Sequence, residues 1–276
     1  TRLRCDWSSD VCSSDLLASD FIEQVTSLTL SKRKNRKNKY IAKTARECSA
    51  FVVRKTWLNL FICNRSFYND ALIMLFEDPD AYCQQGTIIK NGNTCTVFEL
   101  NYQGMHLLIK RYNIKNWRHR LSRLLRKTRA MTSWKNGHLL KFYGIKTPRP
   151  IAIIEKCFGP LRGKAYLITE YLSAESCENY FNNEHSDQEK QAMAYKVMQL
   201  LKGLEDLLIA HGDLKASNIL IFGDQPYLID LDAMKQYNNQ YLYATAHNKD
   251  ISRFNKNWKH NQQVTKLFEE VKNCPP

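Results

Sequence analysis

Residues 211–232 hold the side chains best suited to chemistry, and these lie at the ends of two very apolar segments. Residues 211–222 read HGDLKASNILIF, a GDQP turn follows, and residues 227–232 read YLIDLD. At the mouth of a buried hairpin, an unpaired carboxylate or carboxamide is costly unless it faces solvent, a cation or a substrate. Several polar groups that converge there imply a bound ligand.

The residue types in this segment meet the needs of phosphoryl transfer. That reaction requires a group that orients the attacking hydroxyl, oxygen ligands for magnesium, and a cation for the charge that develops on the phosphate. We predict that Asp213 accepts the hydroxyl proton and that Lys215 neutralises the transferred phosphate. Asn218, five residues after Asp213, and Asp230, at the end of the next strand, are the predicted magnesium ligands.

A simpler interpretation competes with this one. His211 and Asp213 could only fix a loop by hydrogen bonding, and Asp230 and Asp232 could be turn residues. For any one residue the simpler interpretation is the stronger, but it leaves the set as a whole unexplained. The His-x-Asp-x-Lys-x-x-Asn spacing that begins at residue 211 is that of the kinase catalytic loop.

The segments upstream predict an antiparallel sheet, which a kinase-like fold needs before its catalytic loop. Short strands with turn signals between them are expected at residues 87–90, 96–100 and 106–110. Lys110 ends the third of these strands. It is therefore the candidate for the lysine that binds the inner phosphates of a nucleotide.

Two further predictions concern the nucleotide. Asn91, Gly92 and Asn93 are predicted to form a turn that covers the phosphates, although one glycine makes an ordinary hairpin turn an equally good interpretation. Glu170, in a strand expected over residues 165–171 and preceded by another over 151–155, is also predicted to contact the nucleotide.

A long helix is predicted between these strands and the catalytic loop. Ser186 and Glu189 have the spacing of a capping box at its start. One apolar stripe at helical spacing follows, formed by Met193, Val197, Leu200, Leu201, Leu204 and Leu208. This stripe would bury the helix against a core and lead the chain directly to His211.

Several other stretches, taken together with this loop, resemble one bacterial family. They are DPDA at residues 78–81, KNGNT at 90–94, IKRYNIK at 109–115, SWKN at 133–136 and GIKTPRP at 144–150. From about residue 76 to residue 258 the sequence is similar to the lipopolysaccharide core sugar kinases, which phosphorylate heptose or Kdo residues of the inner core.

The resemblance implies an α+β, two-lobed protein-kinase-like fold with an antiparallel-sheet N-lobe and a mainly helical C-lobe. It also implies ATP and magnesium (Mg2+) as cofactors and transfer of the terminal phosphate to a sugar hydroxyl of the lipopolysaccharide inner core on its lipid A precursor. The protein is then expected to be cytoplasmic and peripheral on the inner membrane.

The sequence and the extent of the resemblance together divide the chain into four parts. Residues 1–17 resemble translated sequencing-adapter sequence and are expected to be a non-native leader. Residues 18–75 are predicted to be a basic N-terminal extension with one or two short helices. The N-lobe is expected over residues 76–172, and the C-lobe with the catalytic loop over residues 173–276.

Two features depart from the protein-kinase pattern. Protein kinases pair the strand lysine with a helix glutamate, yet no Asp or Glu lies between Lys110 and Glu155. Either the partner of Lys110 comes from elsewhere, for instance Asp230, or the site is organised differently; Ser133 and Asn136 lie near the place expected for the glutamate. The second departure is Asp232, which we interpret as a salt-bridge partner rather than a further metal ligand.

The charge of the chain indicates anionic partners, and its cysteines bear on disulfide and zinc sites. The formal net charge is +14, and residues 110–149 contain no acid, which suits a phosphorylated and carboxylated inner core and equally suits an anionic membrane surface. Part of this stretch, residues 117–127, is predicted to be a basic amphipathic helix. The nine cysteines include no Cys-x-x-Cys pair, so neither a disulfide framework nor a zinc ribbon is indicated.

Other functions remain as alternatives. A protein kinase should show a long activation segment after Asp232, and none is recognisable. Kinases of cationic small molecules, such as aminoglycosides, fit poorly with a basic acceptor side. A noncatalytic nucleic-acid-binding or pseudokinase protein could use the basic run at residues 32–39, but this leaves Asp213, Asn218 and Asp230 unexplained, so nucleic acid is disfavoured as a partner.

Overall fold

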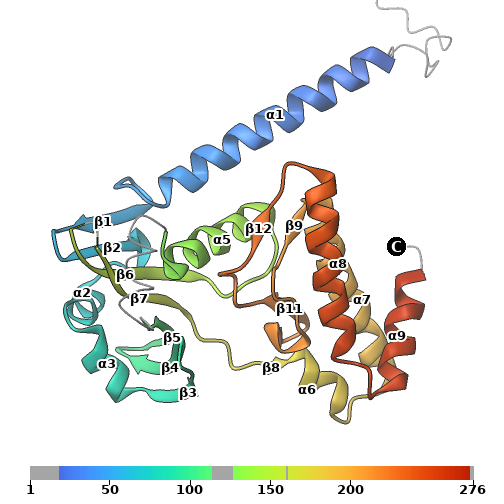
Figure 1. The fold of residues 1–276 in the computed structure, drawn as a ribbon. Helices are drawn as coiled ribbons and strands as arrows, with labels where there is room; N and C mark the ends of the chain where they lie inside the picture. The colour runs from blue at the N-terminus through green and yellow to red at the C-terminus, as the bar shows by residue number, and fades with distance from the viewer. Residues whose placement is uncertain (1–18, 114–126, 160, 274–276) are drawn as a thin grey trace, which may run out of the picture. The chain divides into compact units, whose positions relative to one another are not determined.

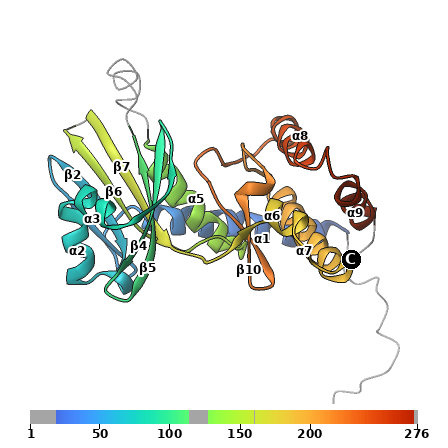
Figure 2. The ribbon, with the colours of Figure 1, turned by 90° about the horizontal axis from the view of Figure 1, so that it is seen from below.

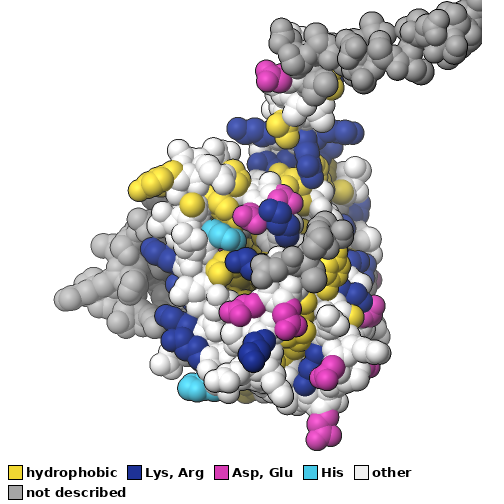
Figure 3. All heavy atoms as spheres, turned by 90° about the vertical axis from the view of Figure 1, so that its right-hand side faces the viewer, with side chains coloured by type: hydrophobic (Ala, Val, Ile, Leu, Met, Phe, Trp, Pro, Cys, Tyr) yellow, Lys and Arg dark blue, Asp and Glu magenta, His cyan; other side chains and the backbone are white. Residues whose placement is uncertain are grey.

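The computed structural model describes residues 19–113, 127–159 and 161–273 (Figure 1). The chain divides into two compact units, Thr1–Ala42 and Lys43–Pro276. Almost all of the first unit's described part is helix α1 (Ser19–Lys43), a 25-residue helix without glycine or proline. Its basic residues 32–39 are almost all exposed and form a dark-blue band in Figure 3.

The second unit contains a seven-stranded antiparallel sheet in the order β1-β2-β6-β7-β5-β4-β3. Its strands are β1 (Phe51–Lys55), β2 (Asn59–Asn64), β3 (Thr87–Asn91), β4 (Cys95–Tyr102), β5 (Met105–Tyr112), β6 (Pro150–Phe158) and β7 (Leu161–Glu170). All five strands predicted from turn signals and apolar runs are confirmed, within a few residues at their ends.

The expectation of one or two short helices over residues 18–75 is wrong in part. This region forms the long helix α1, the strands β1 and β2, a short 3-10 turn at Arg65–Phe67, and the start of α2 (Asp70–Glu77). Strand β2 pairs with β6, with Cys63 opposite Ala152, so these strands belong to the same sheet as β3 to β7. The domain boundary at residue 76 stays a prediction.

Helices cover both faces of the sheet. On one face, α2 and α3 (Pro79–Gln85) bury Leu72, Leu75 and Cys83 against side chains that include Ile154 of β6. On the other face, α5 (Arg129–Tyr143) buries Trp134 in a cluster with Ile153. Neighbouring strand residues therefore serve opposite faces, as the two-residue period of a strand requires, and Figure 2 shows α2 and α3 on one side and α5 on the other.

The remainder of this unit is mainly helical. Its helices are α6 (Cys177–Asn182), α7 (Asp187–Asp206), α8 (Gln240–Lys256) and α9 (Gln262–Asn273). The predicted capping box is present, since Ser186 and Glu189 bond each other's backbone N–H groups, and the apolar stripe of α7 is buried as far as Leu204. Figure 3 shows Lys and Arg interspersed with Asp and Glu over the face it presents, so the net positive charge is not concentrated there.

Short strands connect these helices to the residues that carry the chemistry. The predicted hairpin consists of β10 (Ile219–Phe222) and β11 (Gln225–Leu228), and β8 (Glu175–Ser176) pairs with β10. Strand β9 (Ile209–Ala210) precedes the hairpin in the sequence and β12 (Lys235–Gln236) follows it, and these two strands pair with each other. The molecule is thus a mixed α/β protein with an antiparallel sheet and helices, while its division into two lobes stays a prediction.

Two findings bear on the membrane and acceptor expectations. The predicted basic helix at residues 117–127 lies outside the described residues except for Lys127. Among the helices that the structure describes, none has the length and apolar character needed to cross a bilayer.

Candidate active site

Helix α8 fixes the backbone of the predicted catalytic loop. The carboxylate of Asp250 accepts hydrogen bonds from Gly212 N at 2.9 Å and Leu214 N at 3.4 Å. Arg253 donates to the carbonyl of Gly212 at 2.6 Å and contacts Asp250 at 3.4 Å. At the end of the helix, the side chain of Asn257 accepts from Ala216 N at 3.2 Å.

Sequence analysis did not identify Asp250, Arg253 or Asn257. Their offsets of three and seven residues place them on one face of a helix, but the burial of Asp250 that marks it out is visible only in the structure. Gly212 has φ +83°, and a Cβ there would lie 2.6 Å from the Ala233 carbonyl oxygen, so the loop requires glycine at this position.

The structure brings Asp213, Lys215 and Asn218 together. Lys215 Nζ donates to Asp213 Oδ2 at 2.9 Å, and Asn218 Nδ2 donates to the Asp213 carbonyl oxygen at 2.8 Å. The side chains of Asp213 and Lys215 are 36% and 48% exposed, so both are open to a solvent-borne partner. Among these groups, the Asp213 carboxylate has the acceptor atoms and the access that a hydroxyl would need.

His211 has a structural contact instead. Its ring is buried, and Nε2 donates to the carbonyl oxygen of Ile229 at 2.8 Å. Ile229 N in turn donates to the Asn218 carbonyl oxygen at 3.0 Å. These bonds hold the predicted catalytic loop against the end of β11. The chain segments that contain Asn218 and Asp230 therefore lie next to each other. For His211, loop fixation by hydrogen bonding is confirmed.

Asp230 and Lys110 form an ion pair across 120 residues of sequence. Lys110 Nζ lies 2.5 Å from Asp230 Oδ1, and the two side chains are 15% and 30% exposed. The structure therefore supplies the partner of Lys110 that sequence analysis suggested. Asp230 also has φ +62°, a left-handed conformation that non-glycine residues seldom adopt outside turns and functional sites.

The ion pair holds both groups charged at neutral pH. Burial raises the pKa of the Asp230 carboxyl, but the positive charge and hydrogen bond of Lys110 outweigh burial and leave the pKa below its ordinary value. Burial lowers the pKa of Lys110, while Tyr112 and Asp230 raise it, and the net pKa lies above the ordinary lysine value. A carboxylate anion at this position is what a magnesium ligand must be.

Helix α5 contains no Asp or Glu, and it contacts the segment after Asp230 through Arg129 and Asn136. Arg129 Nε lies 2.8 Å from Asp232 Oδ2, so the salt bridge predicted for Asp232 is present, while its exclusion as a metal ligand stays a prediction. Asn136 Nδ2 donates to the carbonyl oxygens of Leu231 at 2.7 Å and Met234 at 2.9 Å. Ser133 instead bonds the hydroxyl of Tyr112, at 3.0 Å.

The other predicted nucleotide contacts lie in ordinary local structure. Gly92 and Cys95 exchange backbone hydrogen bonds of 3.0 and 3.3 Å, which closes a hairpin beside Asn91 and Asn93. The carboxylate of Glu170 accepts hydrogen bonds from the backbone N–H of Arg149 at 2.7 Å and from the Arg149 guanidinium at 3.1 Å. Within the described residues, neither the turn nor Glu170 bonds to the groups gathered around Asp213 and Asp230, so their roles stay predictions.

A metal would find two oxygen ligands here. The amide oxygen of Asn218 and the carboxylate of Asp230 come from neighbouring strand ends, whereas the described residues contain no group of three or more His, Cys, Asp or Glu that could enclose an ion. Magnesium is commonly held by one or two protein oxygens together with substrate phosphates and water. The donor set therefore fits magnesium brought in with a nucleotide, and it does not suit zinc, which prefers nitrogen and sulfur.

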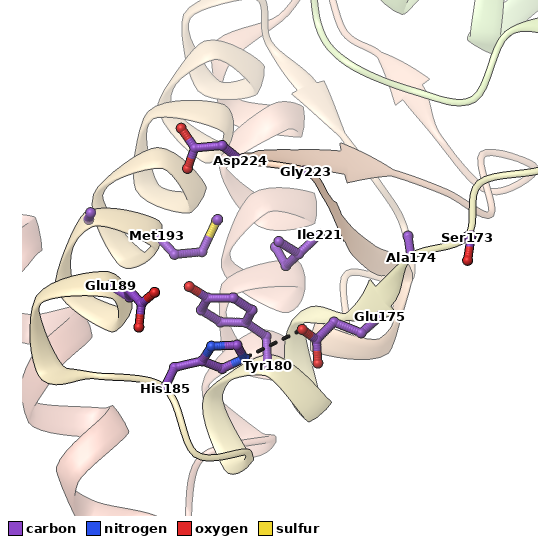
Figure 4. Close-up of a pocket in the computed structure, with 11 residues that line it drawn as sticks. Ser173, Ala174, Glu175, Tyr180, His185, Glu189, Met193, Ile221, Gly223 and Asp224 are labelled. Carbon is purple, nitrogen blue, oxygen red and sulfur yellow. Dashed lines mark ion pairs between the residues drawn. The ribbon is translucent and has the colours of Figure 1, made fainter.

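A separate cavity of about 470 Å³ lies at the opposite end of the β10–β11 hairpin, beside Gly223 and Asp224 (Figure 4). Inside it, His185 stacks on Tyr180 at 4.0 Å between ring centroids and pairs with Glu175 at 3.5 Å. None of the predicted site residues lines this cavity. Asn218 and Asp230 flank the hairpin at its other end, away from this cavity.

Comparison with known families agrees with the sequence resemblance. The profile of the lipopolysaccharide kinase (Kdo/WaaP) family matches residues 84–273, more than two-thirds of the chain. The matched interval includes every residue predicted to act in the site. A comparison with curated proteins yields no match.

Proposed function

Since the chain belongs to the lipopolysaccharide kinase (Kdo/WaaP) family, we propose that it transfers the terminal phosphate of ATP to a heptose or Kdo hydroxyl of the lipopolysaccharide inner core. The observation that carries this proposal is that Lys110 pairs with Asp230, 120 residues away, while Ile229, next to Asp230, donates a backbone hydrogen bond to Asn218. A cation for phosphates and two oxygen ligands for magnesium are thereby gathered beside the accessible carboxylate of Asp213.

Each residue has a role that its contacts support. Asp213 orients the acceptor hydroxyl and takes its proton, and Lys215, 2.9 Å away, is placed to neutralise charge on the transferred phosphate. Asn218 and Asp230 hold magnesium, and Lys110 binds the inner phosphates. Bound magnesium would supply positive charge to the phosphates during transfer.

The acceptor and the location are those that membership of the family implies, and the charge of the chain suits both. Lys and Arg between residues 110 and 149 have no acid among them, so this stretch attracts the phosphates and carboxylates of an inner-core acceptor on its lipid A precursor. The same cations suit an anionic membrane surface, where such a lipid-borne acceptor is found. We therefore propose that the protein is cytoplasmic and works as a peripheral protein at the inner membrane.

The first test is magnesium-dependent transfer of label from ATP to core-truncated lipopolysaccharide by the full chain. Asp213→Asn is expected to lower the rate by about 100-fold or more, because it removes the proton acceptor and leaves the side-chain shape. Asp224→Asn is the matched control, since Asp224 lies at the other end of the same hairpin and its side chain is 80% exposed.

The two possible failures are distinguishable. If Asp213→Asn transfers phosphate as fast as the unaltered chain, the role of Asp213 is wrong. If the folded chain labels no core acceptor but does bind magnesium and ATP, the acceptor is another molecule.

A further inference from the structure

Two cations, each paired with a carboxylate, lie over one buried aromatic ring. The ring is that of Tyr112. Lys110 Nζ lies 5.3 Å from its centroid, and the guanidinium of Arg129 lies 5.1 Å from it. Lys110 pairs with Asp230, and Arg129 pairs with Asp232. The four charges thus form two ion pairs that share Tyr112 as a common neighbour.

Of the two aspartates, Asp232, the partner of Arg129, is more deeply buried than Asp230. Both Nε and one terminal nitrogen of Arg129 approach Asp232 Oδ2, at 2.8 and 2.5 Å. The Asp232 side chain is only 9% exposed, and a carboxylate so little hydrated needs a cation beside it. Burial lowers the pKa of Arg129, but the Asp232 carboxylate beside it outweighs burial and raises that pKa, so the guanidinium stays charged.

Helix α5 also binds the segment after Asp230 through a second side chain, that of Asn136. Arg129 and Asn136 are seven residues apart, which is about two helical turns, so they lie on one face of α5. Asn136 donates to the backbone carbonyls of Leu231 and Met234. Residues 231–234 are therefore bound to the helix through one side chain and two carbonyl groups, directly after the left-handed Asp230.

We propose that Arg129 is a positioning residue whose ion pair with Asp232, together with Asn136, holds Asp230 in the conformation that presents its carboxylate to Lys110 and to magnesium. Kinases commonly use a helix glutamate to hold the strand lysine. In this chain the polarity of the link is reversed, because the helix supplies the cation and the loop supplies the acid. Asp232 then acts on Asp230 through its attachment to α5 and is not a magnesium ligand. This inference rests on the proposed function.

A double-mutant cycle on the full chain tests the inference. Calorimetry measures binding of magnesium with a non-hydrolysable ATP analogue to the unaltered chain, to Arg129→Ala, to Asp232→Asn and to the double variant. Each single change is expected to weaken binding roughly tenfold, and the double variant is expected to bind no more weakly than the worse single one, because both changes break the same pair.

Conservative replacement separates positioning from general stability. Arg129→Lys keeps the charge beside Asp232 and is expected to recover most of the nucleotide affinity lost in Arg129→Ala. The thermal midpoint of every variant is recorded without ligand. Affinity that simply follows that midpoint, with no recovery in Arg129→Lys at equal stability, would overturn the positioning role.

Arg111→Ala is a matched control. Arg111 also pairs with an aspartate, Asp80 at 3.1 Å, and lies over an aromatic ring, that of Phe98 at 5.2 Å. It adjoins Lys110 in β5 and therefore projects from the opposite face of the sheet. Its loss is expected to leave magnesium–nucleotide affinity unchanged.

The remaining outcomes have distinct meanings. If Asp232→Asn weakens binding while Arg129→Ala does not, or if the two losses add fully, Asp232 contacts the ligand itself and the inference fails. If the unaltered chain binds no magnesium nucleotide, the proposed function fails first, and the inference fails with it.

Discussion

Asp230 and Asp232 are separated by one residue but have different partners. Asp230 pairs with Lys110 from a strand, and Asp232 pairs with Arg129 from a helix. Residue type and spacing predicted that this pair of acids would matter. They suggested Asp230 as a partner of Lys110, but they did not reveal that Asp232 pairs with Arg129, which lies 103 residues away in sequence.

Asp230→Asn is expected to change the pH dependence of stability. The folded-state pKa of Asp230 lies below its ordinary value, so the stability it contributes is present above the unfolded pKa of about 4 and is lost as pH falls through the folded pKa. Lys110 behaves in the opposite sense, and its contribution is lost only as pH rises above about 10.

The measurement is the free energy of unfolding of both forms at a series of pH values. The difference between the unaltered chain and Asp230→Asn should be constant from about pH 5 to 9 and should shrink below about pH 4. Asparagine tolerates the left-handed backbone of residue 230, so strain does not confuse the comparison. A difference that varies across pH 5 to 9 would contradict the assigned pairing.

At the scale of elements, local patterns were sufficient for some segments and insufficient for others. Strands β3 to β5 were predictable because apolar runs alternate with Asn-Gly and similar turn signals. The apolar runs of β1 and β2 have no such period, and a short apolar run does not distinguish strand from helix. Their assignment depends on pairing: β1 pairs with β2, and β2 pairs with β6, about 90 residues later, with Cys63 opposite Ala152.

The attachment of α8 to the catalytic loop was equally invisible from local sequence. Asp250→Ala removes the acceptor for Gly212 N and Leu214 N and leaves Arg253 without its acid. We expect the free energy of unfolding to fall by about 2–4 kcal/mol, because the lost carboxylate is buried and bonded. Urea unfolding measures the change, and phosphate transfer should fall as the loop loosens.

Asp206→Ala is the corresponding control on α7. Asp206 is an exposed helix residue that pairs with Lys202 at 3.3 Å, and its loss should cost less than about 0.5 kcal/mol. An equal loss of stability in the two variants would show that the α8 contacts have no special weight.

At the scale of the whole molecule, the buried clusters on both faces of the sheet are formed by residues of Lys43–Pro276. In α1, the described side chains from Glu23 to Arg36 are all exposed. The length of this helix was not predictable, since its sequence has no apolar face that would set a helical period.

Removing residues 1–31 should therefore leave the thermal midpoint of the chain within about 2 °C of its full-length value. Circular dichroism during heating measures the midpoint, and the signal at 222 nm should drop in proportion to the helical residues removed. A much larger fall in the midpoint would show that this part of α1 contributes to folding of the second unit.

The Lys110–Asp230 pair has a consequence for discrimination among anions. An uncompensated lysine in a phosphate site attracts any phosphate in the surrounding solution, including inorganic phosphate and nucleotide without metal. Here the lysine charge is already balanced by a carboxylate 2.5 Å away. An anion arriving alone gains little and faces the repulsion of Asp230, whereas one that carries its own divalent cation satisfies the carboxylate and frees the lysine together. If Lys110 binds phosphates and Asp230 binds magnesium as proposed, the resting ion pair selects for phosphates that arrive as metal complexes.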